Sequence, residues 1–336
     1  MRHLYIIFIV TMIVGCSGSI ELDGNAPSHH LQDGTFTNSN GKAIENSIGD
    51  LIKWQREAPD VTPLKLHIEP PQLEKLANPV AAQVTWIGHS TFLLQVDGLN
   101  ILTDPIFSDR ASPVSFAGPK RTTPPAMTID QLPEIDIVLI SHSHYDHLDK
   151  ATVKALQAKQ PDKPPHYYVP LRLKSWFTKL GVSDVTELDW WDNKKIGDTT
   201  VHAVPVQHWS SRGPLDRNKT LWAGFLVDSP GLRTLFVGDS GYSNDFKTIA
   251  QRLGQVDVAL VPIGAYDPRW IMKSSHMTPE EAAQVVQDVG AKRAIGMHWG
   301  TFALTNEPMA EPAERAVATG VIETPKPGLT IDLTGG

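Results

Sequence analysis

The sequence predicts a layered α/β domain, and three features of the chain lead to this prediction. From Val84 onward, short apolar runs alternate with stretches of helical character, which is the pattern of helices packed on a sheet. The apolar runs are rich in branched residues, as buried strands are. Several of the runs end at a histidine or an aspartate. We therefore expect strands whose carboxyl ends carry a polar site.

Composition and charge narrow the class of protein. The chain has 336 residues, 41% of them hydrophobic, which suffices for one large globular domain or two ordinary ones. The formal net charge is −7, and no long run of Lys or Arg is present. These features disfavour nucleic acid and a polybasic contact with a membrane surface.

The amino-terminal stretch MRHLYIIFIVTMIVGCSG has the pattern of an export signal. Arg2 precedes an apolar run from Leu4 to Val14, which is too short to span a bilayer comfortably. The run ends in IVGC, which resembles the lipobox of bacterial lipoproteins. This resemblance implies cleavage before Cys16, acylation of Cys16 and, with Ser17 following, sorting to the outer membrane. The alternative is an uncleaved anchor or a plain secretory signal. Cys16 is the only cysteine, so the exported chain can form no internal disulfide.

The next part of the chain is expected to connect this anchor to the folded domain. Residues 17 to about 50 are rich in Gly, Ser, Asn and Asp, which is typical of a tether or a loosely packed extension. The stretch from Ser47 to Glu57 predicts a short helix, and several prolines then favour extended chain. We therefore divide the chain into a signal peptide (1–15), a lipidated tether with an N-terminal extension (16–80) and the main domain (81–336).

Four predicted strands lead directly into residues that bind metals. The runs IDIVLIS, VHAVPVQ, RTLFVG and KRAIGM precede His142, His208, Asp239 and His298, respectively. If these strands lie side by side, their carboxyl ends present all of these side chains along one edge. Rigid strands would then fix the positions of the ligands.

The stretch SHSHYDHLD, residues 141 to 149, contains the densest group of such side chains. His142 and His144 are two residues apart, so both can point the same way at a strand end. Asp146 and His147 follow on the turn and can reach a second metal close by, whereas Asp149 is expected to cap the helix KATVKALQAK. Imidazole and carboxylate suit Zn²⁺, although iron and manganese accept similar ligands. Buried polar groups without partners are costly, so a purely structural role does not explain the cluster.

These motifs resemble those of a known family. The pattern H-x-H-x-D-H, with a later His, Asp and His, is the signature of the metallo-β-lactamase superfamily. Within it the chain resembles the N-acylphosphatidylethanolamine-hydrolysing phospholipase D family, from about Val84 to Glu307. The export signal departs from the animal enzymes and leaves the physiological substrate open. The matching stretches are VTWIGHSTFLL, LTDPIFSDRASP, GPKR, VLISHSHYDHLD, ELDWWD, QHWSSR, GDSGY, PIGAYDPRWIM and HWGTFALTNE.

The resemblance implies a four-layer αβ/βα sandwich and two zinc ions. Asp239 would bridge the ions, and Asp104 would either support the site from behind or shape its own turn. Asp146 would also count, with His276, among the catalytic residues. The implied ligands are His142, His144 and His208 for the first ion and Asp146, His147 and His298 for the second.

The implied reaction is hydrolysis of N-acylphosphatidylethanolamine, or a related phospholipid, to N-acylethanolamine and phosphatidate. Two zinc ions, two carboxylates and a metal-bridging hydroxide leave a net charge of about +1 for an anionic phosphate. The hydroxide would attack phosphorus.

His276 would assist departure of the alcohol. It lies just before a helix with Thr278 as N-cap, Pro279 in the first turn, Glu281 completing a capping box and Gly290 at its end. The alternative is that His276 only packs or hydrogen-bonds at the entry of this helix.

Other residues carry weaker signals. His89 is expected to be structural or to support the ligands, and His29 and His30 have no supporting context. Tryptophans near the predicted strand ends either line an acyl-chain groove or pack in the core. They are Trp190, Trp191, Trp209, Trp222, Trp270 and Trp299.

The preferred interpretation is a lipid-anchored zinc phosphodiesterase of the bacterial cell envelope, in the outer membrane facing the periplasm. Its partners would be a phospholipid substrate and, through the anchor, a membrane; oligomeric state is not indicated. A lactonase or another ester hydrolase on the same fold is one alternative. A non-catalytic envelope binding lipoprotein is another, although such a protein would not need a complete set of metal ligands.

Overall fold

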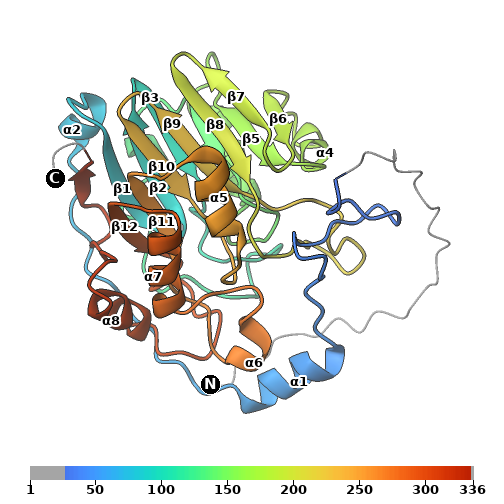
Figure 1. Cartoon of the computed structure of the whole chain (residues 1–336). Helices are drawn as coiled ribbons and strands as arrows, with labels where there is room; N and C mark the ends of the chain where they lie inside the picture. Colours follow the sequence, from blue (N-terminus) through green and yellow to red (C-terminus); the bar gives the residue numbers. More distant parts are fainter. Residues whose placement is uncertain (1–26, 334–336) are drawn as a thin grey trace.

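Two β-sheets packed against each other form the centre of the molecule (Figure 1), seen in a computed structural model that describes residues 27–333. The predicted export signal and Cys16 lie outside these residues. None of the helices between residues 27 and 333 combines the length and apolar character needed to cross a bilayer.

The first sheet has seven strands in the order β13-β1-β2-β3-β4-β5-β6. Strands β3 to β6 are parallel neighbours, whereas β13, β1, β2 and β3 pair antiparallel. Its strands are β1 (Gln83–Gly88), β2 (Thr91–Val96), β3 (Leu99–Thr103), β4 (Ile137–Leu139), β5 (His166–Pro170), β6 (Val185–Leu188) and β13 (Thr330–Asp332).

The second sheet has six strands in the order β12-β11-β10-β9-β8-β7. Strands β10, β11 and β12 are parallel, and β7 to β10 form an antiparallel meander. Its strands are β7 (Asn193–Ile196), β8 (Thr199–Val204), β9 (Gly224–Ser229), β10 (Leu232–Phe236), β11 (Val258–Pro262) and β12 (Arg293–Met297).

Helices cover the outer faces of the two sheets and line one end of the molecule. In Figure 1, α5 and α7 lie in front of the second sheet, and α1 and α6 lie together at the bottom of the view. The helices are α1 (Ile48–Glu57), α2 (Leu73–Ala77), the 3-10 turn η1 (Ile129–Gln131), α3 (Lys150–Lys159), α4 (Lys174–Thr178), α5 (Asp245–Leu253), α6 (Arg269–Met272), α7 (Pro279–Asp288) and α8 (Glu311–Ala318).

Alternation along the strands builds the layers. In β1 and β2, Trp86 and Phe92 belong to the core shared with the second sheet. Ile87 and Leu93 point the other way, into a separate core shared with α3 and α4, because successive side chains of a strand face opposite sides. Burying one such side chain contributes about 1.5–3 kcal/mol. The result is the predicted four-layer αβ/βα sandwich.

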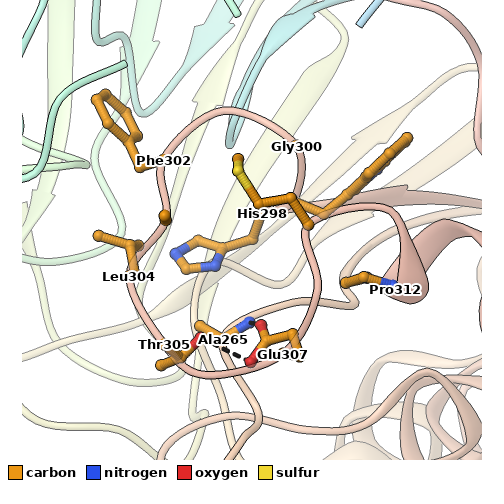
Figure 2. A pocket seen from close by; sticks show the side chains of 11 residues that line it. Ala265, His298, Gly300, Phe302, Leu304, Thr305, Glu307 and Pro312 are labelled. Atoms are coloured by element: carbon orange, nitrogen blue, oxygen red, sulfur yellow. Dashed lines mark hydrogen bonds between the residues drawn. The ribbon is translucent and has the colours of Figure 1, made fainter. Parts of the chain in front are cut away.

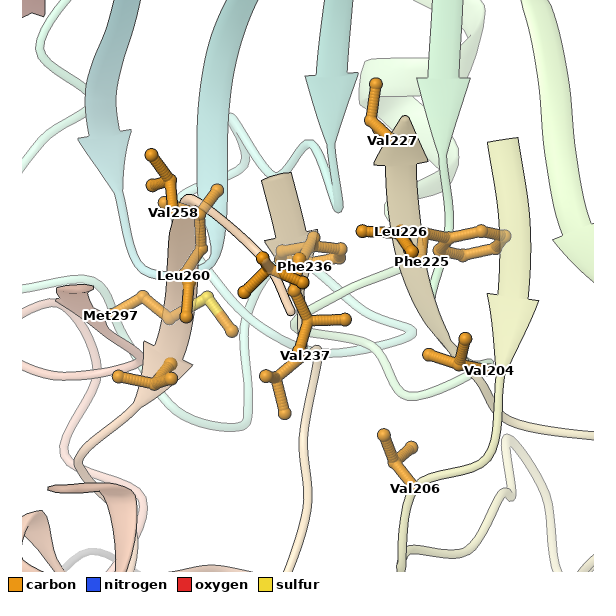
Figure 3. Close-up of a cluster of buried hydrophobic side chains, with 14 of the residues drawn as sticks. Val204, Val206, Phe225, Leu226, Val227, Phe236, Val237, Val258, Leu260 and Met297 are labelled. Carbon is orange, nitrogen blue, oxygen red and sulfur yellow. The ribbon is translucent and has the colours of Figure 1, made fainter. Parts of the chain in front are cut away.

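Figure 3 shows the core of the second sheet. Leu260, Phe236 and Phe225 come from the neighbouring strands β11, β10 and β9 and follow one another from left to right across the view. All three are fully buried. This packing fixes the ends of the strands that are connected to the polar loops.

The four strands that precede the predicted ligands do not lie side by side, so the simple arrangement along one sheet edge does not apply. β4 belongs to the first sheet, whereas β8, β10 and β12 belong to the second and are separated by β9 and β11. The reason is that β9 forms antiparallel pairs with both of its sequence neighbours, β8 and β10, and therefore lies between them. The predicted ligands nevertheless meet, because the loops that follow these strands lie at the same edge of the two-sheet sandwich.

The predicted helix starts are confirmed. The side chain of Ser47 caps α1, Asp149 caps α3 by accepting the Ala151 N–H, and Thr278 forms a capping box with Glu281 at α7. Each cap satisfies a backbone donor that the first helical turn leaves free.

Residues 27–45, expected to belong to the tether or loosely packed extension, lie against the sandwich. Phe36 and Ile44 are buried. The Phe36 N–H donates to the carbonyl oxygen of Asn218 at 2.8 Å, and Arg217 donates to the carbonyl of Ile44. This segment, which we call the N-terminal strap, reaches the edge where the ligands gather.

Candidate metal centre

The first group of ligands consists of three histidines from both sheets. His142 and His144 follow β4, and His208 follows β8. The Nε2 atom of His142 lies 2.8 Å from Nδ1 of His144, and Nε2 of His208 lies 3.3 Å from the same atom. These three nitrogens converge as the ligands of one ion do.

The second group lies beside the first. Oδ2 of Asp146 is 3.3 Å from Nε2 of His147 and 3.4 Å from Nε2 of His298. Both imidazoles are fully buried, and their rings are nearly parallel at 5.2 Å between centroids. A second ion would have two imidazole nitrogens and a carboxylate oxygen here.

Asp239 lies between the two groups. Its Oδ2 atom is 3.1 Å from Nε2 of His298 and 3.2 Å from Nε2 of His147 in the second group. The same atom is 3.8 Å from Nε2 of His208 and 4.0 Å from Nε2 of His142 in the first. One carboxylate oxygen thus faces both groups, and all seven predicted ligands lie together.

The outward-facing nitrogens of three histidines are held by hydrogen bonds. Nδ1 of His147 donates to Oδ2 of Asp104 at 2.6 Å, and Nδ1 of His208 donates to the carbonyl oxygen of Ser275 at 2.9 Å. Nδ1 of His142 lies 2.8 Å from the hydroxyl of Ser141, which itself donates to Asp104. With Nδ1 protonated, Nε2 of each ring presents a lone pair to the centre, as metal ligands require.

The residues present fit bound cations. Oδ1 of Asp239 and Nε2 of His147 and His298 are buried, yet have no hydrogen-bond partner among the described residues. Orphaned buried polar atoms of this kind are rare without a ligand. The sets can hold metal, because imidazole and carboxylate are suitable donors for several transition metals.

The pKa values agree with this charge distribution. Burial lowers the pKa of His142 well below its usual value, which leaves this imidazole neutral. Burial alone would raise the pKa of Asp239, but His147 and His298 hold it well below its usual value. For His298, burial is outweighed by Asp239 and Asp146, which raise its pKa to about 9. The carboxylates therefore attract positive charge, and a metal ion would replace the proton.

The backbone around the centre adopts uncommon conformations. His89, Asp104 and His298 have φ angles of 54°, 32° and 63°, in the left-handed region that non-glycine residues seldom occupy. Gly264 passes so close to His298 that a Cβ atom there would lie 2.2 Å from its carbonyl oxygen. Strain of this kind persists only where the surrounding structure holds it.

His276 lies at the rim of the centre. Its Nδ1 atom is 3.9 Å from Oδ2 of Asp239 and has no hydrogen-bond partner among the described residues. Burial lowers the pKa of His276 to about 4, so its ring is neutral at pH 7. Arg269 donates to the carbonyl oxygen of His276 at 2.9 Å and forms two hydrogen bonds with Glu281. The capping residues of α7 therefore also hold the loop that carries His276.

Two residues outside the seven predicted ligands support the centre: His89, for which the sequence left a structural or a supporting role open, and Asn38, which it did not single out. Nε2 of His89 lies 3.0 Å from Oδ2 of Asp146, the same oxygen that faces His147 and His298. Asn38, in the N-terminal strap, accepts a hydrogen bond from the backbone N–H of His208 at 3.0 Å. The motif WIGHST around His89 was the only signal for the first, and nothing in the strap pointed to the second.

The loop that follows β12 encloses a small cavity beside His298 (Figure 2). The cavity has a volume of about 20 Å³. Glu307 holds the loop by accepting the N–H groups of Ala265 and Asp267 at 2.6 and 3.1 Å. A cavity of this size, which His298 helps to line, is too small for an acyl chain.

The tryptophans divide between the core and the site. Trp190, Trp222 and Trp299 are buried core residues, and Trp191 is partly buried against the same core. The ring of Trp209 lies 4.3 Å from the ring of His144. Trp270 is 46% exposed at α6, beside α1. Only the last two are placed where they could meet a substrate chain or a membrane.

Comparisons with known proteins agree with the fold and identify relatives. Residues 99–299 match the beta-lactamase superfamily domain. An N-acyl-phosphatidylethanolamine-hydrolyzing phospholipase D from Caenorhabditis elegans is 43% identical over 242 residues, which cover 69% of this chain and 67% of the relative. The outer membrane protein RomA of Klebsiella pneumoniae is 45% identical over 101 residues, covering 30% of this chain and 74% of RomA.

Solved structures show the same fold at low sequence identity. A possible metal-dependent hydrolase from Veillonella parvula superposes with a TM-score of 0.60 at 17% identity. The superposition covers 75% of this chain and all of the other. This similarity supports the arrangement of layers. At this level of identity it indicates nothing about the substrate.

Proposed function

This chain belongs to the N-acylphosphatidylethanolamine-hydrolysing phospholipase D family of the metallo-β-lactamase superfamily, and we propose from this that it is a zinc-dependent phosphodiesterase. Its substrate would be N-acylphosphatidylethanolamine or a related phospholipid. The observation that carries the proposal is the position of Oδ2 of Asp239, within 4.0 Å of ligand nitrogens from both groups. A single carboxylate shared by two metal pockets suits a phosphate, whose several oxygens can be held at once.

We assign two metal ions to the centre, both zinc. His142, His144 and His208 would hold one, and Asp146, His147 and His298 the other, with Asp239 shared. When bound, the ions supply Lewis acidity and lower the pKa of water to near ~7, so that a nucleophile is available at neutral pH.

The residues of the chain would orient this chemistry. The ionised Asp239 and Asp146 fix the charge of the centre, and the hydrogen bond from His147 to Asp104 fixes a ligand ring. In the reaction, an oxygen from water bonds to phosphorus and the bond from phosphorus to the ethanolamine oxygen breaks. Phosphatidate and N-acylethanolamine are the products, and the departing oxygen takes up a proton.

His276 would assist that departure. Because its ring is neutral at pH 7 and its Nδ1 atom faces the centre, it would act as a hydrogen-bond donor to the leaving oxygen. Arg269 and Glu281 would act as positioning residues, since they hold the backbone of the His276 loop.

We further propose that Cys16 is lipidated and anchors the protein in the bacterial outer membrane, facing the periplasm. Support comes from the lipobox-like IVGC and from the similarity to a protein named for the outer membrane. A lipid anchor would keep the enzyme at the surface that contains its substrate.

The test is a hydrolysis assay on the chain starting after Cys16, with metal analysis of the same sample. N-acylphosphatidylethanolamine in mixed micelles should yield N-acylethanolamine and phosphatidate, and the protein should contain at least about two zinc ions per chain, the number that the catalytic centre would hold. A neutral lactone of similar chain length should be turned over far more slowly. Faster turnover of the lactone would replace the phosphodiesterase with a lactonase, and turnover of neither by metal-loaded protein would favour a binding protein.

A further inference from the structure

A second cluster of metal-binding side chains lies away from the catalytic centre. It joins His29 and His30 of the N-terminal strap to Asp189, in the loop between β6 and β7. Nε2 of His29 is 2.6 Å from Oδ1 of Asp189, and Nε2 of His30 is 2.8 Å from Oδ2. All three side chains are largely shielded from solvent.

Two adjacent histidines can reach the same carboxylate only if the backbone turns at this point. Neighbouring residues of an extended chain point to opposite sides. Here a turn, closed by a hydrogen bond from the His30 N–H to the carbonyl oxygen of Pro27, brings both rings to one carboxylate. The rings lie 4.6 Å apart and 84° from parallel. The catalytic pair His142 and His144 has nearly the same geometry, 4.5 Å and 87°.

Aromatic neighbours hold both rings in place. His29 stacks on Trp190 at 4.2 Å, and the edge of His30 meets Phe36 at 5.1 Å. Burial raises the pKa of Asp189, but the hydrogen bond from His29 outweighs it, and the pKa of this carboxyl is lowered. The site therefore has three preorganised donors, two of them imidazoles and one an ionised carboxylate. Preorganisation of this kind favours metal binding, since little freedom is lost.

We propose that His29, His30 and Asp189 form a further zinc site, which fastens the N-terminal strap to the sandwich. Two imidazoles and a carboxylate leave a fourth tetrahedral position for water, which can enter because the side chains of His30 and Asp189 are each 17% exposed. The strap also carries Asn38, which accepts the backbone N–H of the proposed ligand His208. Zinc at this site would thus hold the strap, and with it Asn38, in the position that supports His208. It would take no part in the reaction.

The full-length protein tests this by its zinc content. The double variant His29→Gln, His30→Gln keeps N–H donors for Asp189 but removes the imidazole ligands. After loading with zinc and removal of loosely held ions, it should contain one zinc fewer per chain than the wild type. His166→Gln is the matched control, because His166 pairs with a single carboxylate, Asp184, at 2.5 Å. This control should keep the wild-type content.

If the double variant fails to fold, a second variant and a chelator assay test the same site. Asp189→Asn retains a hydrogen-bond acceptor for one histidine and should also lose one zinc. In the wild type, a coloured chelator should remove one zinc in a fast phase, because the catalytic ligands are more deeply buried; this phase should be absent from Asp189→Asn. Wild-type zinc content in folded variants at both positions would overturn the proposal and leave a hydrogen-bonded clamp.

Discussion

Nδ1 of His147 lies 2.6 Å from Oδ2 of Asp104, and neither side chain is exposed to solvent. This bond fixes which nitrogen of His147 faces the metal centre. Asp104 also accepts the N–H and the hydroxyl of Ser141, so one carboxylate orients the strand end that carries the first ligands.

Replacing Asp104 by Asn should therefore weaken metal binding without removing a ligand. We expect metal affinity to fall about 10- to 100-fold, as is typical when a support of a metal-bound histidine is lost. Competition with a chelator measures this, with the exposed Asp109→Asn as control. An unchanged affinity would mean that Asp104 serves only the turn in which it lies.

Asp239→Asn tests the shared carboxylate. An amide cannot bridge two cations as a carboxylate does, so one zinc should bind weakly or not at all, and activity should fall by several orders of magnitude. Metal analysis and circular dichroism should show a folded protein with less zinc. The control is Asp228→Asn, which removes a surface ion pair with Arg233. If Asp239→Asn keeps both ions tightly and turns over normally, another group bridges them.

His276→Ala tests help to the leaving group. Loss of such help typically lowers the rate ~10²- to 10⁴-fold, and the loss should be large for N-acylethanolamine phospholipids. Nitrophenolate is a leaving group that departs without a proton. Hydrolysis of a substrate that carries it should therefore keep its rate. Zinc content should not change. Equal losses on both substrates would instead assign His276 to phosphate binding or to folding.

Asn38→Ala tests the contact between the N-terminal strap and His208. The backbone N–H of His208 would be left buried without an acceptor, which costs ~1–3 kcal/mol. Urea unfolding should show this loss, and zinc should leave the catalytic centre faster. The exposed Ser39→Ala, also in the strap, should change stability by less than ~0.5 kcal/mol. If the two variants behave alike, the strap does not support His208.

Cys16→Ser tests the anchor. If Cys16 is acylated, the variant should accumulate as a precursor of full length, whereas the wild type should be shortened and labelled by a fatty-acid analogue. Gel mobility and metabolic labelling read out the two effects. Equal labelling of both forms would rule out the lipobox interpretation.

Local signals made the fold and the ligand sets predictable. The strand before His142 and the caps at Asp149 and Thr278 depend on neighbouring residues, and the structure has them where the sequence predicts them. The family motif allowed the grouping of the seven ligands, since spacing alone cannot tell which distant histidine joins which group.

Other features depend on contacts between distant parts of the chain. The sheet order separates β8, β10 and β12, because hairpin pairing of β9 decides it and the apolar runs look alike. His29 and His30 meet a carboxylate about 160 positions away, and Asn38 meets the backbone of His208. Neither pairing leaves a pattern in the sequence, so only the folded chain reveals them.

The division of the ligands between the two sheets has a consequence for assembly. His142, His144, Asp146 and His147 follow a strand of one sheet, whereas His208, Asp239 and His298 follow strands of the other. Neither half of the chain therefore possesses the complete centre by itself, and an ion bound by ligands from both halves would favour the joined state over the separated one. If the ions bind as proposed, both pockets would fill only after the two halves have closed, and loss of the ions would loosen the molecule along the seam between its sheets.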